Sequence, residues 1–200
     1  NLETIYWIRD IIEKGSNWFS NQGVRGRKGF HSFSISGRVK NPGVKIAPAG
    51  TTVQELIDNY CDGMAEGHTF KGYLPGGASG GILPSSLNNI PLDYGSKELD
   101  DEGCFLGSAA VIILSDKDNM MEVGLNLLKF FEEESCGQCT PCRVGTEKTV
   151  KIMKQRLWNK QKLEDLSEVM TEASICGLGQ AASNPLKSVM KHFGKELNYE

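Results

Sequence analysis

Apolar residues in the first quarter of the chain follow two different periods. Between residues 5 and 12 they recur at the spacing of an amphipathic helix, and Gly15 ends this pattern. Over residues 33–39 apolar and polar positions alternate, as they do in a half-buried strand. The sequence Asn-Pro-Gly at 41–43 predicts a turn before a second short strand at 44–46. We therefore expect a helix, a linker and a strand–turn–strand unit.

A short helix and a buried strand are predicted next. Two threonines at 51–52 precede Gln54 and Glu55 at the spacing of a capping box, which indicates the start of a helix. The apolar residues of this helix fall on one face: Val53, Leu56, Ile57 and Tyr60. AAVIIL, residues 109–114, has the length and composition of a buried strand. These elements predict a small mixed α+β domain over residues 30–118.

The remainder of the chain shows four stripes of apolar residues at helical spacing. Four such segments with short connections favour an all-α helical bundle over residues 119–200, so the fold class is α+β. We expect the residues of these stripes to form the core of the bundle. They are Met120, Met121, Val123, Leu127, Leu128, Phe130 and Phe131; Val150, Met153 and Leu157; Leu163, Leu166, Val169, Met170 and Ala173; and Leu186, Val189, Met190 and Phe193.

Composition excludes several classes of function. The 200 residues suffice for one or two domains, and a net charge of −3 gives no basic field for nucleic acid. The basic residues at 23–29 are interpreted as a solvated, glycine-broken linker. No apolar run approaches the roughly 18 residues of a membrane helix, so we expect a soluble protein without membrane insertion. The chain starts at Asn1 without a Met, which suggests that it is a fragment.

Three of the six cysteines lie at intervals of three residues. Cys136, Cys139 and Cys142 form C-x2-C-x2-C, and Cys176 follows in a glycine-rich break between predicted helices. Zinc sites usually take two separated pairs of ligands, and disulfides among three such close thiols would be strained. A [4Fe-4S] cube can take three close thiolates and one distant one. The spacing therefore favours an iron–sulfur cluster over structural zinc, a disulfide or coincidence.

The residues around these cysteines suit a thiolate site. Thr140 is expected to be the N-cap before Pro141, which places Cys142 in the first turn of a helix, and Ser183 and Asn184 before Pro185 repeat this device. Three glycines are expected to let the backbone approach the cluster: Gly137, Gly177 and Gly179. Arg143 can offset the charge of a cluster or remain a solvated surface residue. Cys61 and Cys104 have no partner spacing and are predicted to be buried structural thiols.

Two glycine-rich motifs and the histidines do not indicate a second activity. GLGQAA at 177–182 has the form of a dinucleotide fingerprint, but no strand is predicted before it. GGASGG at 76–81 lacks the GK[ST] of a phosphate loop and is interpreted as a tight turn. The three histidines are scattered, so no catalytic triad is proposed.

The cysteine segment also resembles a known family. ESCGQCTPCRVGTEKTV at 134–150, followed by ICGLG at 175–179, resembles the iron–sulfur segment of NADH-oxidising flavoprotein (diaphorase) subunits. Such subunits occur in respiratory complex I, in NAD-linked hydrogenases and in soluble NAD-dependent formate dehydrogenase. SISGRVKNPGVKIAPAGTTVQELI at 34–57 resembles the family's soluble-ligand-binding β-grasp (SLBB) domain. Residues 76–84 and 92–116 most resemble the formate dehydrogenase beta subunit, and the resemblance covers essentially the whole chain.

The resemblance implies a domain order and a set of cofactors. Residues 1–29 would be the end of a missing domain that binds FMN and NAD(H), residues 30–118 the β-grasp domain, and residues 119–200 a four-helix bundle that binds one [4Fe-4S] cluster. The four metal-ligating residues would be Cys136, Cys139, Cys142 and Cys176. The NLET run would place Asn1 and Thr4 near the FMN, and Leu178 would approach the flavin.

The resemblance also implies a role and partners. The chain would relay electrons between FMN and other subunits of a cytoplasmic NAD-dependent formate dehydrogenase. Its partners would be a [2Fe-2S] thioredoxin-like subunit and a catalytic dehydrogenase subunit. Without the missing domain we expect the chain to be inactive with NADH. A flavoprotein subunit of complex I, peripheral to a membrane, or of an NAD-linked hydrogenase is the alternative within the family. A non-redox β-grasp binding module with structural zinc is the alternative outside it.

Overall fold

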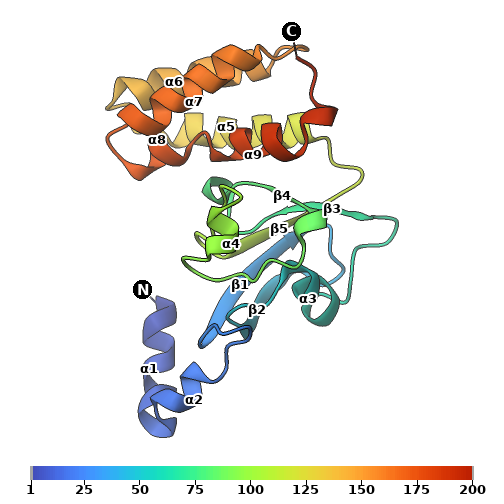
Figure 1. Cartoon of the computed structure of the whole chain (residues 1–200), viewed down its shortest axis with the longest axis vertical. Helices are drawn as coiled ribbons and strands as arrows, with labels where there is room; N and C mark the ends of the chain where they lie inside the picture. The colour runs from blue at the N-terminus through green and yellow to red at the C-terminus, as the bar shows by residue number, and fades with distance from the viewer. Residues whose placement is uncertain (1, 200) are drawn as a thin grey trace.

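The computed structural model describes residues 2–199, and its elements lie in three tiers (Figure 1). Two N-terminal helices form one end, a five-stranded mixed sheet occupies the middle, and helices α5 to α9 form the other end. The predicted α+β class is therefore confirmed, with the strands in the first part of the chain and the long helices in the last.

The first tier is joined to the sheet by aromatic side chains. Helices α1 (Leu2–Lys14) and α2 (Ser16–Ser20) confirm the predicted N-terminal helix and its end at Gly15. Trp7 stacks on Phe30 with ring centroids 5.0 Å apart, and it also contacts Phe19 at 5.6 Å. No residue of α1 is buried, and five large apolar side chains are exposed on it: Leu2, Ile5, Tyr6, Ile8 and Ile12.

The sheet is built around the strand predicted from AAVIIL. The strands are β1 (Phe30–Gly37), β2 (Gly43–Pro48), β3 (Phe70–Leu74), β4 (Leu83–Pro84) and β5 (Ala110–Ser115). Their order is β2-β1-β5-β3-β4, with β1 and β5 parallel and the other neighbouring pairs antiparallel. The predicted strand–turn–strand unit is the β1–β2 hairpin; β1 starts three residues earlier and ends two residues earlier than predicted, and β2 extends beyond its predicted bounds at both ends.

The first hydrophobic core lies between the sheet and the short helix after β2. Thr52 and Glu55 form the predicted capping box at the start of α3 (Val53–Glu55), which continues as one π-helical turn at Leu56–Tyr60. Val53, Leu56 and Ile57 are buried as expected, whereas Tyr60 is only partly buried. The short helix α4 (Lys97–Asp100) contributes Leu99 to the same core.

The second core fixes the helices to the sheet. The helical tier consists of α5 (Met120–Glu134), α6 (Thr140–Met153), α7 (Lys160–Ala173), α8 (Gly177–Ala181) and α9 (Asn184–His192). Leu74 and Leu114 of the sheet pack in one cluster with Leu128 of α5 and Val189 of α9. The backbone N–H of Ile82 also donates to Ser188 Oγ at 2.9 Å in a buried hydrogen bond across this boundary.

Four residues of the predicted helical stripes are exposed, Ala173 at the end of α7 among them. Phe130, Leu157 and Val169 are 46%, 47% and 50% exposed. Leu157 lies beyond the end of α6, and its neighbour Trp158 occupies the core instead and donates from Nε1 to the carbonyl of Met153. Phe130 and Val169 lie within α5 and α7 but are exposed. The helices themselves are as predicted, but the buried stripe on each is narrower than the sequence pattern suggested.

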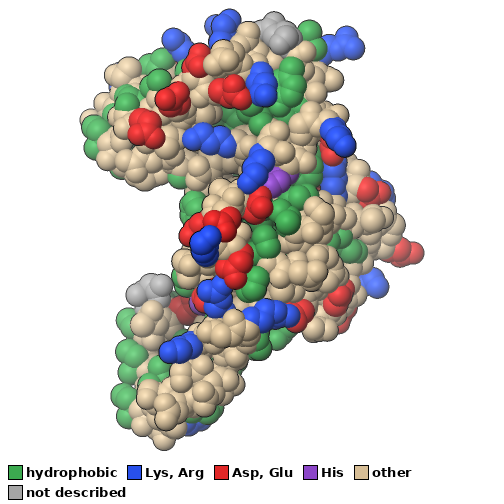
Figure 2. Space-filling view, in the orientation of Figure 1, with side chains coloured by type: hydrophobic (Ala, Val, Ile, Leu, Met, Phe, Trp, Pro, Cys, Tyr) green, Lys and Arg blue, Asp and Glu red, His purple; other side chains and the backbone are tan. Residues whose placement is uncertain are grey.

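The surface mixes charges of both signs. Lys and Arg side chains are interspersed with Asp and Glu over the face seen in Figure 2. The basic residues at 23–29 are less solvated than predicted, because Arg25 pairs with Glu55 at 2.7 Å and Arg27 with Glu98 at 2.8 Å. Among residues 2–199 no helix is both long and apolar enough to cross a membrane.

Candidate functional site

The two cysteine-bearing segments come together at one end of the helical tier. Cys136 and Cys139 lie in the loop between α5 and α6, and Cys142 lies in the first turn of α6, as predicted. Cys176 immediately precedes α8, a short helix that packs against both α6 and α7. Segments more than 30 residues apart in the sequence therefore face a common region of the structure.

Cys139 is the point at which these segments meet. The backbone N–H of Ile175 is the largest of several influences that hold the pKa of the Cys139 thiol below its usual value, and the N–H of Cys142 adds to it. N–H groups directed at sulfur favour the thiolate, which is the form that binds metal. The residue before Cys176 thus already donates to a cysteine of the C-x2-C-x2-C motif.

The loop before α6 is held by side-chain hydrogen bonds. Ser135 Oγ lies 3.3 Å from Cys142 Sγ and accepts a hydrogen bond from the N–H of Gly137. Gly137 has φ +76°, a conformation that other residues rarely adopt. The guanidinium of Arg143 donates to the carbonyl of Gly137 and to Thr140 Oγ1, so this side chain braces the loop.

The start of α6 differs from the prediction by one residue. The helix begins at Thr140 itself, with Cys139 as the N-cap and Pro141 in the first turn. Thr140 Oγ1 accepts from Arg143 instead of capping a backbone N–H, which explains why the expected threonine cap is absent. Ser183 precedes α9 as its N-cap without a side-chain cap, and Pro185 lies in the first turn as predicted.

Gly179 provides the close backbone approach that was expected of three glycines. A Cβ at Gly179 would lie 2.6 Å from Ser174 Cβ and 2.9 Å from Cys142 Cβ, so a larger residue would displace one of them. Gly177, in contrast, has open space around the same position. Gly179 therefore lets α8 pack closely against Cys142, while the predicted approach of these glycines to a cluster stays a prediction.

The four thiols differ in exposure. Cys142 is buried, Cys139 is partly buried, and Cys136 and Cys176 are exposed. Across residues 2–199 no three His, Cys, Asp or Glu side chains converge closely enough to hold one metal ion. Thiolates that accept hydrogen bonds from backbone N–H groups are the ligands that a [4Fe-4S] cube takes. This donor set of thiols and backbone N–H groups suits the cube.

The other two cysteines are buried in the first core, as predicted. Cys61 and Cys104 are 0% and 1% exposed and pack among apolar side chains of the sheet domain. Burial raises the pKa of the Cys104 thiol to about 12 and also raises that of Cys61. A raised pKa disfavours the thiolate, which is the form of cysteine that binds metal.

The residues expected near a flavin do not form one group. Asn1 lies outside the described residues. Thr4 lies on α1, where it lines a small hollow of about 260 Å³ with Trp7 and Tyr94. Leu178 lies on α8 beside the cysteines, partly buried against Phe131 and Met170. Since α1 and α8 belong to opposite tiers of Figure 1, the chain brings only Leu178 to the cysteine end.

The two glycine-rich motifs have the structural roles expected of them. GLGQAA forms α8 and its end, and it follows the helix α7 and a short coil rather than a strand. It therefore lacks the βαβ context of a dinucleotide site. GGASGG forms a tight turn in which Gly77 and Gly81 have φ +84° and +79°.

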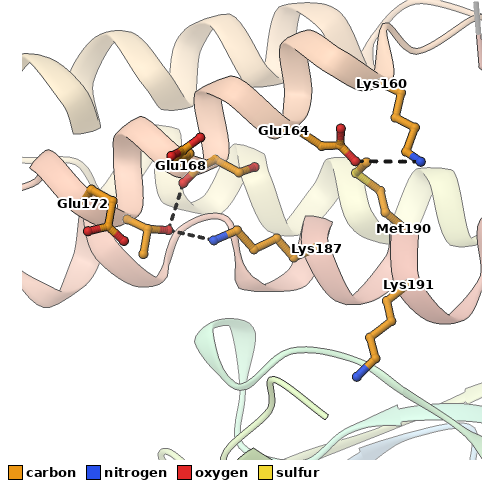
Figure 3. Close-up of a pocket in the computed structure, with 9 residues that line it drawn as sticks. Lys160, Glu164, Glu168, Glu172, Lys187, Met190 and Lys191 are labelled. Atoms are coloured by element: carbon orange, nitrogen blue, oxygen red, sulfur yellow. Dashed lines mark hydrogen bonds and ion pairs between the residues drawn. The ribbon is translucent and has the colours of Figure 1, made fainter. Parts of the chain in front are cut away.

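A separate groove of about 410 Å³ lies between α7 and α9 (Figure 3). Its walls carry Glu164, Glu168 and Glu172 from α7 and Lys187 from α9, which donates to Thr171 Oγ1 at 2.8 Å. Ser167 also lines it. No cysteine lines the groove, so it is distinct from the cysteine end.

Two hydroxyl groups of the cysteine end were not predicted from the sequence. Ser135 contacts Cys142 directly, and Ser174 is buried between Cys139 and Gly179. A serine within two residues of a motif cysteine was the only available signal, and it is too common to identify a contact.

Comparisons with known proteins agree with this geometry. Residues 122–200 match the family described as the NADH-ubiquinone oxidoreductase-F iron-sulfur binding region. The chain is 34% identical over 205 residues to the mitochondrial NADH dehydrogenase (ubiquinone) flavoprotein 1 of Dictyostelium discoideum, covering 98% of this chain and 42% of that protein. It is also 34% identical to the NADP-reducing hydrogenase subunit HndC of Solidesulfovibrio fructosivorans, covering 98% and 41%.

A solved structure shows the same fold. The NAD⁺-reducing [NiFe]-hydrogenase in the H₂-reduced state superposes with a TM-score of 0.82 at 28% identity, covering 98% of this chain and 34% of that one. The chain spans less than half the length of each of these relatives. Residues 122–200 therefore match an NADH-ubiquinone oxidoreductase-F iron-sulfur binding region, and nearly the whole chain is similar to a part of these NADH dehydrogenase and hydrogenase proteins.

Proposed function

We propose that Cys136, Cys139, Cys142 and Cys176 hold the [4Fe-4S] cluster of this region. The observation that carries the proposal is the meeting of the two segments at Cys139, whose thiol faces the N–H of Ile175. All four cysteines lie within the residues that match the iron–sulfur family, whereas Cys61 and Cys104 lie in the apolar core outside it.

The residues around the cysteines would prepare and hold the site. The N–H groups of Ile175 and Cys142 favour thiolate at Cys139, because hydrogen bonds donated to the sulfur stabilise its negative charge. Arg143 and Ser135 fix the loop that carries Cys136, and Gly179 lets α8 approach Cys142. The cluster, when bound, supplies one-electron transfer.

The domain organisation predicted from the sequence supports this role. We propose that residues 1–29 belong with an FMN- and NAD(H)-binding domain, residues 30–118 form the SLBB-type β-grasp domain, and residues 119–200 form a four-helix bundle. The β1–β2 hairpin, the crossing helix α3 and the parallel β1–β5 pair support the second assignment. The mutual packing of α5 with α6 and α9, and of α6 with α7, supports the third.

The proposed activity is an electron relay within an NAD(H)-dependent diaphorase subunit. The names of the relatives support NAD-linked electron transfer, since they are an NADH dehydrogenase flavoprotein and two pyridine-nucleotide-reducing hydrogenases. Thr4 and Leu178 would lie toward the FMN of the intact subunit, as would Asn1. The chain itself carries no strand–GxGxxG–helix unit in its described residues, so we expect no NADH oxidation by these 200 residues alone.

For the parent complex we propose a cytoplasmic NAD-dependent formate dehydrogenase. The support is the resemblance of residues 76–84 and 92–116 to its beta subunit. The partners would be a [2Fe-2S] thioredoxin-like subunit and a catalytic dehydrogenase subunit. Complex I or an NAD-linked hydrogenase is the second candidate, favoured by the similarity to relatives of both types. Identifying the subunits that co-purify with the full-length protein distinguishes these candidates.

The test of the relay is the iron and acid-labile sulfide content after anaerobic purification. We expect about four of each per chain, a brown protein, and a paramagnetic signal after reduction with dithionite. One zinc per chain without sulfide would instead support the β-grasp binding module with a structural metal. NADH-dependent dye reduction by the 200-residue chain would contradict the proposed division between flavin domain and relay.

A further inference from the structure

Ser174 occupies a fixed position between the two cysteine segments. It follows the last residue of α7, where its backbone N–H donates to the carbonyl of Met170 at 3.3 Å. Its own carbonyl accepts from Gln180 Nε2 at 3.0 Å. Both backbone groups are therefore engaged, and the side-chain hydroxyl is the polar group that is left.

This hydroxyl is buried without a partner. Ser174 is only 6% exposed, and within residues 2–199 its Oγ has no hydrogen-bond partner of good geometry. A buried hydroxyl without a partner is unfavourable, because it has lost its bonds to water and gained none in return. Such a group indicates an acceptor that is supplied when the site is loaded.

The neighbours of the hydroxyl identify that acceptor. Gly179 and Cys142 confine the side chain, since a Cβ at Gly179 would overlap Ser174 and crowd Cys142. The Ser174 hydroxyl is also the last of the groups that hold the pKa of the Cys139 thiol below its usual value, although it has no aligned hydrogen-bond partner among the described residues. Because a hydroxyl rotates to suit its acceptor, this group can be directed at the Cys139 sulfur.

We propose that Ser174 is a positioning residue whose hydroxyl donates a hydrogen bond to Cys139 Sγ in the loaded centre and raises its reduction potential. This inference rests on the proposed function. Reduction adds negative charge that is shared by the ligand sulfurs, so a donor to sulfur stabilises the reduced form more than the oxidised form. Removal of the hydroxyl should therefore make reduction harder without removing a ligand.

The test compares Ser174→Ala with Ser167→Ala in the iron-loaded 200-residue chain. Ser167 is a matched control because it too is buried, at 2% exposed, and has no hydrogen-bond partner for its side chain among the described residues, but it lies within α7 at the groove of Figure 3. A redox titration followed by electron paramagnetic resonance gives the midpoint potential. We expect Ser174→Ala to shift the reduction equilibrium about tenfold toward the oxidised form, which is about 59 mV lower for one electron. Ser167→Ala should match the wild-type chain.

Each other outcome has a defined meaning. Equal potentials for wild type and Ser174→Ala, both with a full cluster, would overturn the inference. A folded Ser174→Ala chain that takes up no iron would also overturn it, because the hydroxyl would then serve assembly. Ser174→Thr keeps the hydroxyl, so we expect its midpoint potential to lie closer to that of the wild type than the alanine variant's does. A shift in Ser174→Thr as large as that in Ser174→Ala would contradict the proposal. A wild-type chain that binds no [4Fe-4S] cluster would instead refute the proposed function itself.

Discussion

The sheet domain and the cysteine end of the helical tier both bury a thiol but surround it with different groups. Cys104 is 1% exposed and Cys142 is 4% exposed. Cys104 lies among apolar side chains that raise its pKa to about 12, whereas Cys142 lies in the first turn of α6 with Ser135 Oγ 3.3 Å from its sulfur. Burial alone therefore does not decide the role of a cysteine; the polar groups around its sulfur do.

The two regions also use glycine differently. In the sheet domain Gly77 and Gly81 have positive φ in a tight turn, and Gly37 has positive φ at the end of β1, where a Cβ would meet the carbonyl of Ile113. Gly179 lies within a helix and is needed because its missing side chain leaves room for Ser174 and Cys142. The first kind of glycine shapes the fold, and the second brings a helix to the site.

The largest expected effect is the loss of the cluster when a ligand is removed. Replacing any of Cys136, Cys139, Cys142 or Cys176 by Ser should abolish or cripple iron incorporation, because each thiolate holds one corner of the cube. Since ligation and folding are coupled, these variants should also unfold at lower urea concentration. Iron and sulfide per chain and urea unfolding measure the two effects.

The control for this experiment is the sheet domain. Cys61→Ala and Cys104→Ala should keep the full iron content, although each leaves a small cavity in the first core. Retention of the cluster by Cys176→Ser together with its loss in Cys104→Ser would show that the fourth ligand is assigned to the wrong cysteine.

A second large difference is expected in thiol reactivity of the iron-free chain. Cys136 and Cys176 are exposed and should be alkylated by iodoacetamide at about the rate of an unfolded peptide at pH 7. Cys61 and Cys104 should react at least about a hundredfold more slowly than the exposed cysteines, because the core must open before the reagent can reach them. Mass spectrometry of digests after timed labelling gives all these rates in one sample. Equal rates at Cys104 and Cys176 would contradict the comparison.

How far the sequence predicted each region depends on the range of the interactions. The capping box of Thr52 and Glu55, the β1–β2 hairpin and the buried strand at 110–115 depend on neighbours within a few residues, and all were predicted. The exposed positions of Phe130 and Val169 depend on which helix packs against which, and periodicity does not contain that information.

The same limit applies to the site. The spacing of Cys136, Cys139 and Cys142 predicted a cluster motif, because these residues are close in any conformation. The placement of Ser174 between Cys139 and Gly179 requires α7 and α8 to fold back onto α6, which is a tertiary contact. Contacts of this kind were therefore found only in the structure.

A moderate effect is expected from adding one methyl group to α8. Gly179→Ala would push against Ser174 and Cys142, and overpacking of this kind typically costs about 1–3 kcal/mol. Gly177→Ala is the matched control two residues away, because nothing lies within 4 Å of its added Cβ, and alanine favours the helix by up to about 1 kcal/mol. Urea unfolding and iron content of both loaded variants test this. Equal stability of the two variants would rule out the close approach at Gly179.

The smallest effect is expected at the connection between the sheet domain and the helical tier. Asp118 lies between β5 and α5, where its carboxylate pairs with Arg38 at 2.8 Å and accepts from the N–H of Ser115 at 2.7 Å. The Arg38 guanidinium, with help from Ser115, holds the pKa of the Asp118 carboxyl at about 2. Because the folded pKa is below the usual 3.8, this contribution to stability is present above about pH 4 and is lost as the pH falls toward 2.

Asp118→Asn should therefore lower the free energy of unfolding by about 1 kcal/mol at pH 7. This figure is smaller than the pKa shift alone would give, because the Arg38 side of the pair is exposed and screened by solvent. The difference from the wild-type chain should shrink as the pH falls from 4 toward 2, where the wild-type carboxyl also becomes neutral. Asp101→Asn is the control, because its pairing with Lys97 is exposed and its loss should change stability much less at either pH. Urea unfolding of the iron-free chains at about pH 7 and about pH 2.5 measures both. A difference that persists unchanged in acid would mean that Asp118 acts through packing and not through its charge.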